Sequence, residues 1–517
     1  MAQAGMTAQD PRPKASPEAA APFELAREPE ARCRLDEILF AELKRKGIRP
    51  ARPCSDAVFL RRASLDAAGT LPTADEARSF LADKRPDKRA RLIDALLARD
   101  EFVDFWTLRW CDTLRVKAEF PINLWPNAVQ AYHRWVREAV RVDMPYDRMA
   151  RALLTASGSN FRNGPVNFFR AVQSKDPASV ARAVALTFMG CRTDRWPRAR
   201  LDGMALFFSQ IAYKHTLEWK EEVIVWDQAR ASAPKAPRSA MLPDGSRSAL
   251  TADRDPRFAF ADWLTRPGNP WFAAAAANRV WFWLMGRGIV HEPDDLRPDN
   301  PPSCPALLAE LQRELVAGRF SLRSLVRTIM NSSAYQLSSI PRSTGPAAEA
   351  LFAAYPVRRL EAEVLVDAIN QITGTTETYS SPIPEPFTFI PENKRSIALA
   401  DGSTTSAFLE LFGRPSRDTG MALERSGKPT AGQSLHLLNS SHILQKLQRG
   451  PAMLDFFTSA RNTADGVERL YLAILSRFPT EAEKAAAHSY AGPALTQAEI
   501  VDLAWALMNG PEFLCKH

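Results

Sequence analysis

The densest group of residue types that bind metal ions lies in one short segment, residues 291–300. It offers the oxygen ligands Asp294, Asp295, Asp299 and Asn300, with His291 and Glu292 beside them. Closely spaced carboxylate and amide oxygens suit hard cations, so the segment predicts a Ca²⁺ or Mg²⁺ site. The alternative is structural, because Asp and Asn also stabilise turns and helix starts. The spacing lacks the Asp-x-Asp-x-Asp-Gly pattern of a known calcium loop, which favours the structural role.

A second group combines arginines and acids in a segment rich in Gly and Pro, residues 412–428. The candidate ligand-binding residues there are Arg414, Arg417, Glu424 and Arg425. Guanidinium groups bind carboxylates and phosphates through two parallel hydrogen bonds, so the segment could hold an anion. A phosphate-binding Walker loop is excluded, because Gly420 and Gly427 lie too far apart. The alternative is that arginine–carboxylate pairs fix a buried loop between helices.

No local motif marks a catalytic nucleophile or a zinc site. The chain has no Gly-x-Ser-x-Gly, no His-Glu-x-x-His and no Cys-x-x-Cys. His436 and His442 are six residues apart, which predicts different faces of a helix. His215 and Glu218 are spaced so that they could share one helix face. The sequence therefore leaves open whether the protein is an enzyme, because any catalytic set must come from distant residues.

Composition and charge narrow the range of partners. The chain has 517 residues, of which 45% are hydrophobic and 24% are charged, as is usual for globular proteins. Its net charge of +8 is spread along the chain without a basic stripe, so nucleic acid is not an expected partner. The most apolar run, Trp271 to Met285, is too short for a bilayer, so no membrane span is expected. The first residues lack the apolar region of an export signal.

The elements that must position these residues are mostly helical. Apolar residues recur at helical spacing, so the expected fold is mainly α, with two helical domains at residues 26–215 and 251–517. Residues 216–250, with the β-branched run 221–226 and turn chemistry at 241–245, predict a small β-hairpin and linker near the junction. A disordered segment is expected at residues 1–25 and a long irregular loop at 374–406.

Several local signals complete this outline. A Glu three residues after each of Thr73, Thr480 and Thr496 predicts a capping box at a helix start. Helical spacing also predicts a helix over residues 200–213. Most Trp and Tyr side chains are expected in the core, while Trp125 and Tyr379, in surroundings rich in Pro, Asn and Ser, are expected to be exposed. Exposed aromatic rings of this kind stack on sugars.

Ordered motifs along both halves resemble a known pair of families. In the first half they include Phe59-Leu-Arg-Arg62 and Gly69-Thr-Leu-Pro-Thr73. In the second half they include Asn278-Arg-Val-Trp281, Tyr335-Gln-Leu-Ser-Ser339 and Phe412-Gly-Arg-Pro415. The first half resembles the planctomycete cytochrome-C-like domain. The second half resembles its usual partner, a planctomycete domain of unknown function.

The haem-attachment loop of the first family is missing here. Gly190 and Trp196 are a few residues apart, and a single Cys191 stands where the family has two Cys and a His. Covalent haem attachment needs two thiols and an axial imidazole, so no haem is expected. The remaining cysteines are scattered, and Cys33 and Cys54, which flank an early helix, could pair.

The resemblance implies an extracytoplasmic protein, periplasmic or exported, with a role in electron transfer or polysaccharide handling. Loss of the haem loop argues against electron transfer. We therefore expect a binding or scaffolding protein without redox activity, whose partner is polysaccharide or another exported protein. The alternative is a metal-assisted hydrolase that uses the 291–300 loop.

Overall fold

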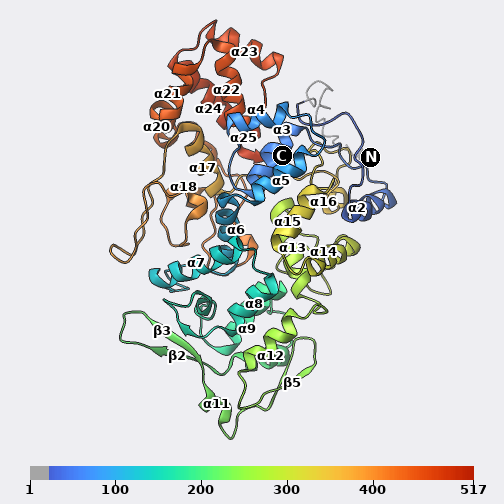
Figure 1. Ribbon diagram of the computed structural model, residues 1–517, viewed down its shortest axis with the longest axis vertical. Helices are drawn as coiled ribbons and strands as arrows, with labels where there is room; N and C mark the ends of the chain where they lie inside the picture. The colour runs from blue at the N-terminus through green and yellow to red at the C-terminus, as the bar shows by residue number, and fades with distance from the viewer. Residues whose placement is uncertain (1–21) are drawn as a thin grey trace, which may run out of the picture.

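The computed structural model describes residues 22–517 and confirms a mainly α fold (Figure 1). The described residues form 24 α-helices and three small sheets of two or three strands. Most of the segment predicted to be disordered, residues 1–21, lies outside the described residues, and farther along Glu24 forms an antiparallel bridge with Cys54. Within residues 22–517, no helix has the length and apolar content that crossing a bilayer requires.

The first half of the chain is a set of packed helices. They are α2 (Arg34–Arg45), α3 (Asp56–Ala67), α4 (Ala74–Ala82), α5 (Lys88–Leu97), α6 (Asp100–Thr113), α7 (Pro126–Arg141), α8 (Tyr146–Thr155), η1 (Gly164–Phe169), α9 (Pro177–Met189), α10 (Arg198–Ala205) and η2 (Leu206–Phe208). The predicted capping box starts α4, where the Thr73 hydroxyl accepts the N–H of Glu76 and the Glu76 carboxylate accepts the N–H of Thr73. The helix predicted over residues 200–213 is too long, because residues 211–215 pair with a strand instead.

Two hairpins occupy the junction, at the lower end of the molecule in Figure 1. Their elements are β1 (Gly158–Ser159), β2 (Ile211–His215), β3 (Glu222–Trp226), α11 (Gln228–Ser232), β4 (Ser239–Met241) and β5 (Arg247–Ala249). β3 lies between β1 and β2 in one antiparallel sheet, and β4 pairs with β5 in another. The predicted strand over 221–226 therefore exists, but it pairs with β2, while the turn at 241–245 belongs to the second hairpin.

The second half is again helical. Its elements are α12 (Pro256–Thr265), α13 (Phe272–Met285), α14 (Pro305–Ala317), α15 (Leu322–Asn331), α16 (Pro346–Ala350), β6 (Arg358–Arg359), α17 (Ala362–Thr373), η3 (Ser396–Ala398), α18 (Ala407–Leu411), η4 (Ala422–Glu424), α19 (Ala431–Asn439), α20 (Ser441–Arg449), α21 (Pro451–Ser459), α22 (Thr463–Leu475), α23 (Glu481–Ala491), α24 (Gln497–Asn509), α25 (Pro511–Leu514) and β7 (Cys515–Lys516). Thr480 and Thr496 start α23 and α24 with the predicted capping boxes. Between α17 and α18, the segment 374–406 contains the short turn η3 and one isolated bridge, Ser380 to Thr405.

Both halves contribute to the hydrophobic core. Trp283 of α13 packs edge-on against Trp106 and Trp110 of α6, with ring centroids 5.5 and 5.2 Å apart. Asp66 of α3 is fully buried and accepts hydrogen bonds from the hydroxyls of Tyr335 and Tyr355. Elements of the second half thus complete the interior of the first, and the proposed domain boundary near residue 250 stays a prediction.

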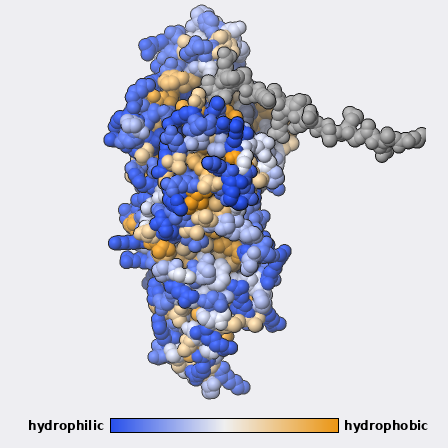
Figure 2. All heavy atoms as spheres, turned by 90° about the vertical axis from the view of Figure 1, so that its right-hand side faces the viewer, coloured by the Kyte–Doolittle hydropathy of each residue, from blue (hydrophilic) through white to orange (hydrophobic). Residues whose placement is uncertain are grey.

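The surface gives a first pointer to function. The face in Figure 2 is mostly hydrophilic, with hydrophobic residues scattered in small groups. The most exposed large hydrophobic side chains of the described residues are Leu217, Phe120, Phe389 and Trp219.

All six cysteines are free, so Cys33 and Cys54 do not form the pair that the sequence allowed.

Candidate functional site

The predicted arginine-rich segment, residues 412–428, has charged partners within the chain. Arg425 contacts Asp112 of α6 at 2.7 Å and Glu363 of α17 at 2.6 Å. Arg417, whose side chain is 3% exposed, contacts the same Asp112 at 2.8 Å. Burial alone would lower the pKa of the Arg425 guanidinium, but Glu363 and Asp112 outweigh it and hold this pKa well above its usual value. The segment is therefore fixed to α6 and α17 by ion pairs.

Glu424 and Arg414 shape the same segment through the backbone. The Glu424 carboxylate accepts the N–H groups of Asp418, Thr419 and Gly420 at 2.9 to 3.2 Å. Arg414 donates to the carbonyl of Thr404. These contacts match the structural alternative, a loop fixed by its own charges. A role for the four predicted residues in holding a ligand stays a prediction.

Asp294 joins the two predicted site groups. Its carboxylate pairs with Arg279 of α13 at 3.0 Å, and both side chains are 2% exposed. The same carboxylate accepts the N–H of Ala422 at 2.7 Å, inside the arginine-rich segment. A buried carboxylate requires such partners, because an unpaired charge in the interior is costly. Asp294 thus ties the 291–300 loop to the 412–428 segment.

The other predicted metal ligands are also engaged within the loop. Asp295 and Asp299 share Arg297, at 2.8 and 3.3 Å. The Asn300 amide donates to the carbonyl of Asp295 at 2.9 Å. Among the residues that the structure describes, no group of three or more His, Cys, Asp or Glu is arranged to hold a metal ion. The Ca²⁺ or Mg²⁺ site stays a prediction, and this geometry lends it no support.

The 291–300 loop packs against Gly190 and Cys191, the residues at which the expected haem-attachment loop is missing from the sequence. Gly190 ends α9 with φ of 59°, and a side chain there would meet Leu296 at 2.9 Å. The Leu296 N–H donates to the Gly190 carbonyl at 2.8 Å, and the Cys191 thiol donates to the Leu296 carbonyl at 3.1 Å. Burial raises the pKa of Cys191 to about 12, so this thiol is neutral and unreactive near neutral pH. Cys191 therefore has a packing role here.

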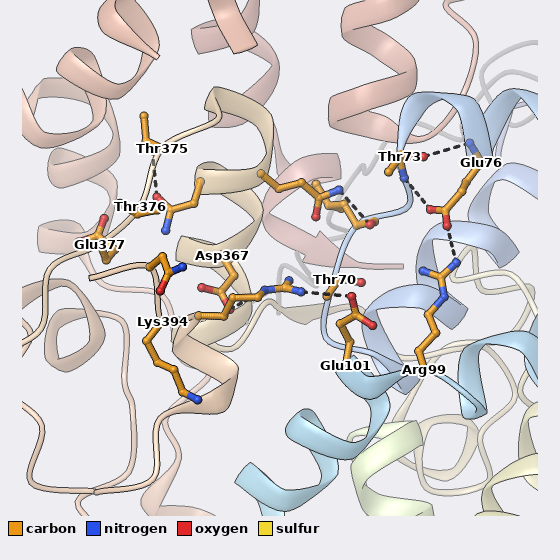
Figure 3. A pocket seen from close by; sticks show the side chains of 15 residues that line it. Thr70, Thr73, Glu76, Arg99, Glu101, Asp367, Thr375, Thr376, Glu377 and Lys394 are labelled. Carbon is orange, nitrogen blue, oxygen red and sulfur yellow. Dashed lines mark hydrogen bonds and ion pairs between the residues drawn. The ribbon is translucent and has the colours of Figure 1, made fainter. Parts of the chain in front are cut away.

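A polar hollow of about 590 Å³ lies where residues 374–406 meet α4 and α6 (Figure 3). Arg395 lies between Glu101 and Asp367, at 3.6 and 3.8 Å. Burial raises the pKa of Asp367, although backbone N–H groups of η3 donate to it. The uncharged polar lining consists of Thr70, Thr73, Asn370, Gln371, Thr375, Thr376 and Asn393. The lining includes no aromatic ring, so this hollow offers hydrogen bonds but no stacking surface.

Exposed aromatic side chains gather around the tip of the β2–β3 hairpin. Trp219 is 69% exposed and Phe120 is 79% exposed. The Lys220 ammonium lies 5.2 Å from the Trp219 ring centroid and 5.8 Å from that of Trp125. Trp125 in turn packs edge-on against Phe387 from the 374–406 segment, with centroids 5.5 Å apart. We call these five residues the Trp219 surface.

A second polar hollow, of about 660 Å³, adjoins the Trp219 surface. Its polar lining includes Asn123, Gln173, Lys175, His215, Thr216, Glu218 and Glu222. Glu222 contacts Arg170 and Lys175, each at 2.6 Å. Burial alone would raise the pKa of Glu222, but hydrogen bonds from Lys175 and Arg170 outweigh it and lower this pKa. The hollow therefore combines fixed charges with amide and hydroxyl groups beside exposed aromatic rings.

Three sequence predictions about these residues are wrong. Trp125 is half-buried, because Phe387 and Lys220 cover it. Tyr379 is 7% exposed, and its hydroxyl is hydrogen-bonded to Ser396. His215 lies on strand β2 and shares no helix face with Glu218. The exposed Trp219 gave no sequence signal beyond its place in a polar run between two strands.

Two histidines also form a pair that the sequence did not predict. His436 of α19 and His442 of α20 have ring nitrogens 3.4 Å apart, and His442 contacts Glu377 at 2.8 Å. They do not lie on different faces of one helix, as predicted, because the chain turns at Ser440 between the two helices. The Ser440 side chain accepts the N–H of Ile443 and so starts α20. Consecutive serines at 440 and 441 were the available signal for this helix start.

Comparison with known families places two matches in order along the chain. Residues 34–194 match PSCyt2, described as a protein of unknown function (DUF1549). Residues 256–491 match PSD1, described as a protein of unknown function (DUF1553). Comparisons with curated proteins and with solved structures find no match. The chain therefore carries two domains of unknown function in tandem, and neither description states an activity.

Proposed function

We propose that this chain is a binding protein that holds polysaccharide on the Trp219 surface and acts outside the cytoplasm. The observation that carries the proposal is the ring of Trp219, 69% exposed at the edge of a polar hollow. So large an apolar side chain is normally buried, and its exposure therefore points to a partner that covers it. A sugar ring offers an apolar face for stacking and hydroxyl groups for the hollow.

The chemistry of the hollow supports a polyhydroxylated partner. Amide, hydroxyl and charged side chains line it, and each kind can form hydrogen bonds with sugar hydroxyls. The lining carries the cations Arg170, Lys175 and Lys220 and the carboxylates Glu218, Glu221 and Glu222, and Glu222 is paired with Arg170 and Lys175. These charges balance, so a neutral polysaccharide is the best match. A second exported protein is the other candidate occupant of the same surface.

The metal-assisted hydrolase gains less support. Its candidate carboxylates, Asp294, Asp295 and Asp299, are paired with Arg279 and Arg297. In the Trp219 surface, by contrast, the side chains of Trp219 and Phe120 are 69% and 79% exposed. We therefore propose binding, without redox chemistry, in preference to catalysis. The extracytoplasmic location is drawn from the family resemblance, and cell fractionation tests it.

Affinity electrophoresis of the full chain through gels that contain alginate, dextran or no polysaccharide tests the proposal. We expect dextran to retard the protein and Trp219→Ala to weaken this binding at least about tenfold, as truncation of a central Trp commonly does. Phe457→Ala, which removes a 38% exposed aromatic ring from α21, is the matched control and should behave like the wild type. Unchanged retardation of Trp219→Ala, or no retardation by either polysaccharide, would overturn the proposal. Salt-sensitive binding to duplex DNA instead would favour a nucleic-acid partner.

A further inference from the structure

A cavity of about 520 Å³ lies between α6, α13, β6 and the 412–428 segment. Its lining shares no residue with the hollow beside the Trp219 surface. Its apolar lining includes Phe282, Trp283, Leu360, Phe412 and Met421. Val357 and Leu423 also line it and are 57% and 50% exposed, so the cavity opens to solvent beside them. A volume of this size is typical of sites for small organic molecules.

The charges around this cavity are unbalanced. Its lining contains the arginines Arg109, Arg279, Arg358, Arg359 and Arg425 and the carboxylates Asp112 and Glu361. Four of these arginines form ion pairs within the chain, with Glu361, Asp294, Asp66 and Asp112 as partners. Arg359 forms no ion pair within residues 22–517. Its guanidinium donates to the amide oxygen of Gln433 and lies 5.6 Å from the Phe412 ring centroid.

Two further donors on the cavity wall lack acceptors. Arg109 is 8% exposed, and its Nε–H has no hydrogen-bond partner among the described residues. The Nε–H of the neighbouring Arg358 is likewise buried without a partner there. A buried donor without an acceptor typically costs about 1–3 kcal/mol, so such groups are rare without a reason. An anionic oxygen in the cavity would supply the missing acceptor.

We infer that this cavity binds a small organic anion with a carboxylate or phosphate head group and an apolar body. Arg359 supplies the positive charge that has no carboxylate partner within residues 22–517, and Arg109 supplies the unsatisfied buried donor. Trp283, Phe412 and Met421 supply an apolar surface for the body of the ligand. The inference is independent of the polysaccharide proposal, because the two sites share no residue.

Titration of the full chain with three probes of equal chain length tests the ligand class. The probes are decanoate, decyl phosphate and decanol, which differ in their head groups. Calorimetry gives affinity and stoichiometry, and tryptophan fluorescence reports on Trp283 in the cavity wall. We expect one equivalent of decanoate or decyl phosphate to bind at least about tenfold more tightly than decanol, since a hydrogen bond to a charged group is worth about the 1.4 kcal/mol that this factor represents. The preferred anion identifies the head group, and equal binding of all three probes would overturn the inference.

Variants of the cavity mouth locate the site. Arg359→Gln should weaken binding of the preferred anion about tenfold, and it leaves no carboxylate unpaired, so the fold should persist. Arg182→Gln, on the exposed face of α9, is the matched control and should bind like the wild type. Leu423→Asp, at the half-exposed rim, should weaken binding of the anion more than Leu423→Asn does. Wild-type affinity in both Arg359→Gln and Leu423→Asp would refute the assignment.

Discussion

Replacing Asp112 by Asn tests whether ion pairs hold the 412–428 segment in place. The Asp112 carboxylate contacts Arg417 at 2.8 Å and Arg425 at 2.7 Å, and Asn keeps its shape without its charge. Arg417, 3% exposed, then loses its carboxylate, whereas Arg425 keeps Glu363. Removing one partner of a buried pair typically costs about 3–5 kcal/mol. Because Glu363 stays and the Asp112 side chain is 18% exposed, we expect the lower end, about 3 kcal/mol.

Denaturant titration measures this loss as a lower midpoint of unfolding at constant slope. Limited proteolysis under native conditions should also show new cleavage inside residues 412–428, because a segment released from α6 becomes accessible. Asp455→Asn, at an exposed position on α21, is the control and should change the free energy of unfolding by less than about 0.5 kcal/mol. A loss below about 1 kcal/mol for Asp112→Asn, with the segment still resistant to protease, would refute the reasoning.

Burial lowers the pKa of His133 to about 3, below the value of about 6.5 in the unfolded chain. The stability of the fold with neutral His133 buried is therefore complete above pH 6.5 and is lost as the pH falls towards 3, because the unfolded chain then binds a proton that the folded chain does not. His133→Gln should therefore flatten the fall in unfolding free energy over this range, and an unchanged slope in denaturant titrations would contradict it. Gly190→Ala should lower the free energy of unfolding by more than the roughly 1–2 kcal/mol that a left-handed backbone costs a non-glycine residue, because the new Cβ meets Leu296 at 2.9 Å. Gly47→Ala, at a φ of 67° with no atom within 4 Å of the new Cβ, is the control. In thermal unfolding it should show the cost of the left-handed backbone alone. Asp294→Ala leaves the buried Arg279 unpaired and should cost about 3–5 kcal/mol with or without a metal, so Asp299→Ala, whose side chain is 65% exposed, is the cleaner probe. Elemental analysis that shows less bound Ca²⁺ or Mg²⁺ in Asp299→Ala would support the metal site.

Features determined by neighbouring residues could be predicted from the sequence. The capping boxes at Thr73, Thr480 and Thr496 form as predicted, because hydroxyl and carboxylate lie three residues apart and need no distant partner. The helical class follows in the same way from the spacing of apolar residues. The helix predicted over 200–213 failed at its end, where pairing with β3 overrides local helical preference.

The candidate sites depend on contacts that one sequence does not specify. Arg417 contacts Asp112, which lies 305 residues earlier in the chain. The sequence could suggest that Arg417 forms an ion pair, but it could not identify the carboxylate. Trp125 lies in polar surroundings in the sequence, yet Phe387 from a distant segment packs against it. Tyr379 also lies in polar surroundings, and its hydroxyl is hydrogen-bonded to Ser396, 17 residues farther along the same irregular segment. Trp219 is exposed because it lies at a hairpin tip, and that hairpin forms between strands whose pairing was predicted wrongly. Placement of the aromatic surface therefore required the tertiary structure.

The buried carboxylate of Asp66 has a consequence for synthesis on the ribosome. Its hydroxyl partners, Tyr335 and Tyr355, follow it by 269 and 289 residues, and its cationic partners, Arg358 and Lys516, come later still. At roughly 5–20 residues per second, the growing chain waits about 13–54 s before even the first partner is made. Until then α3 cannot bury this charge without a large cost. On this ground, α3 reaches its buried position only after the second half of the chain has been synthesised.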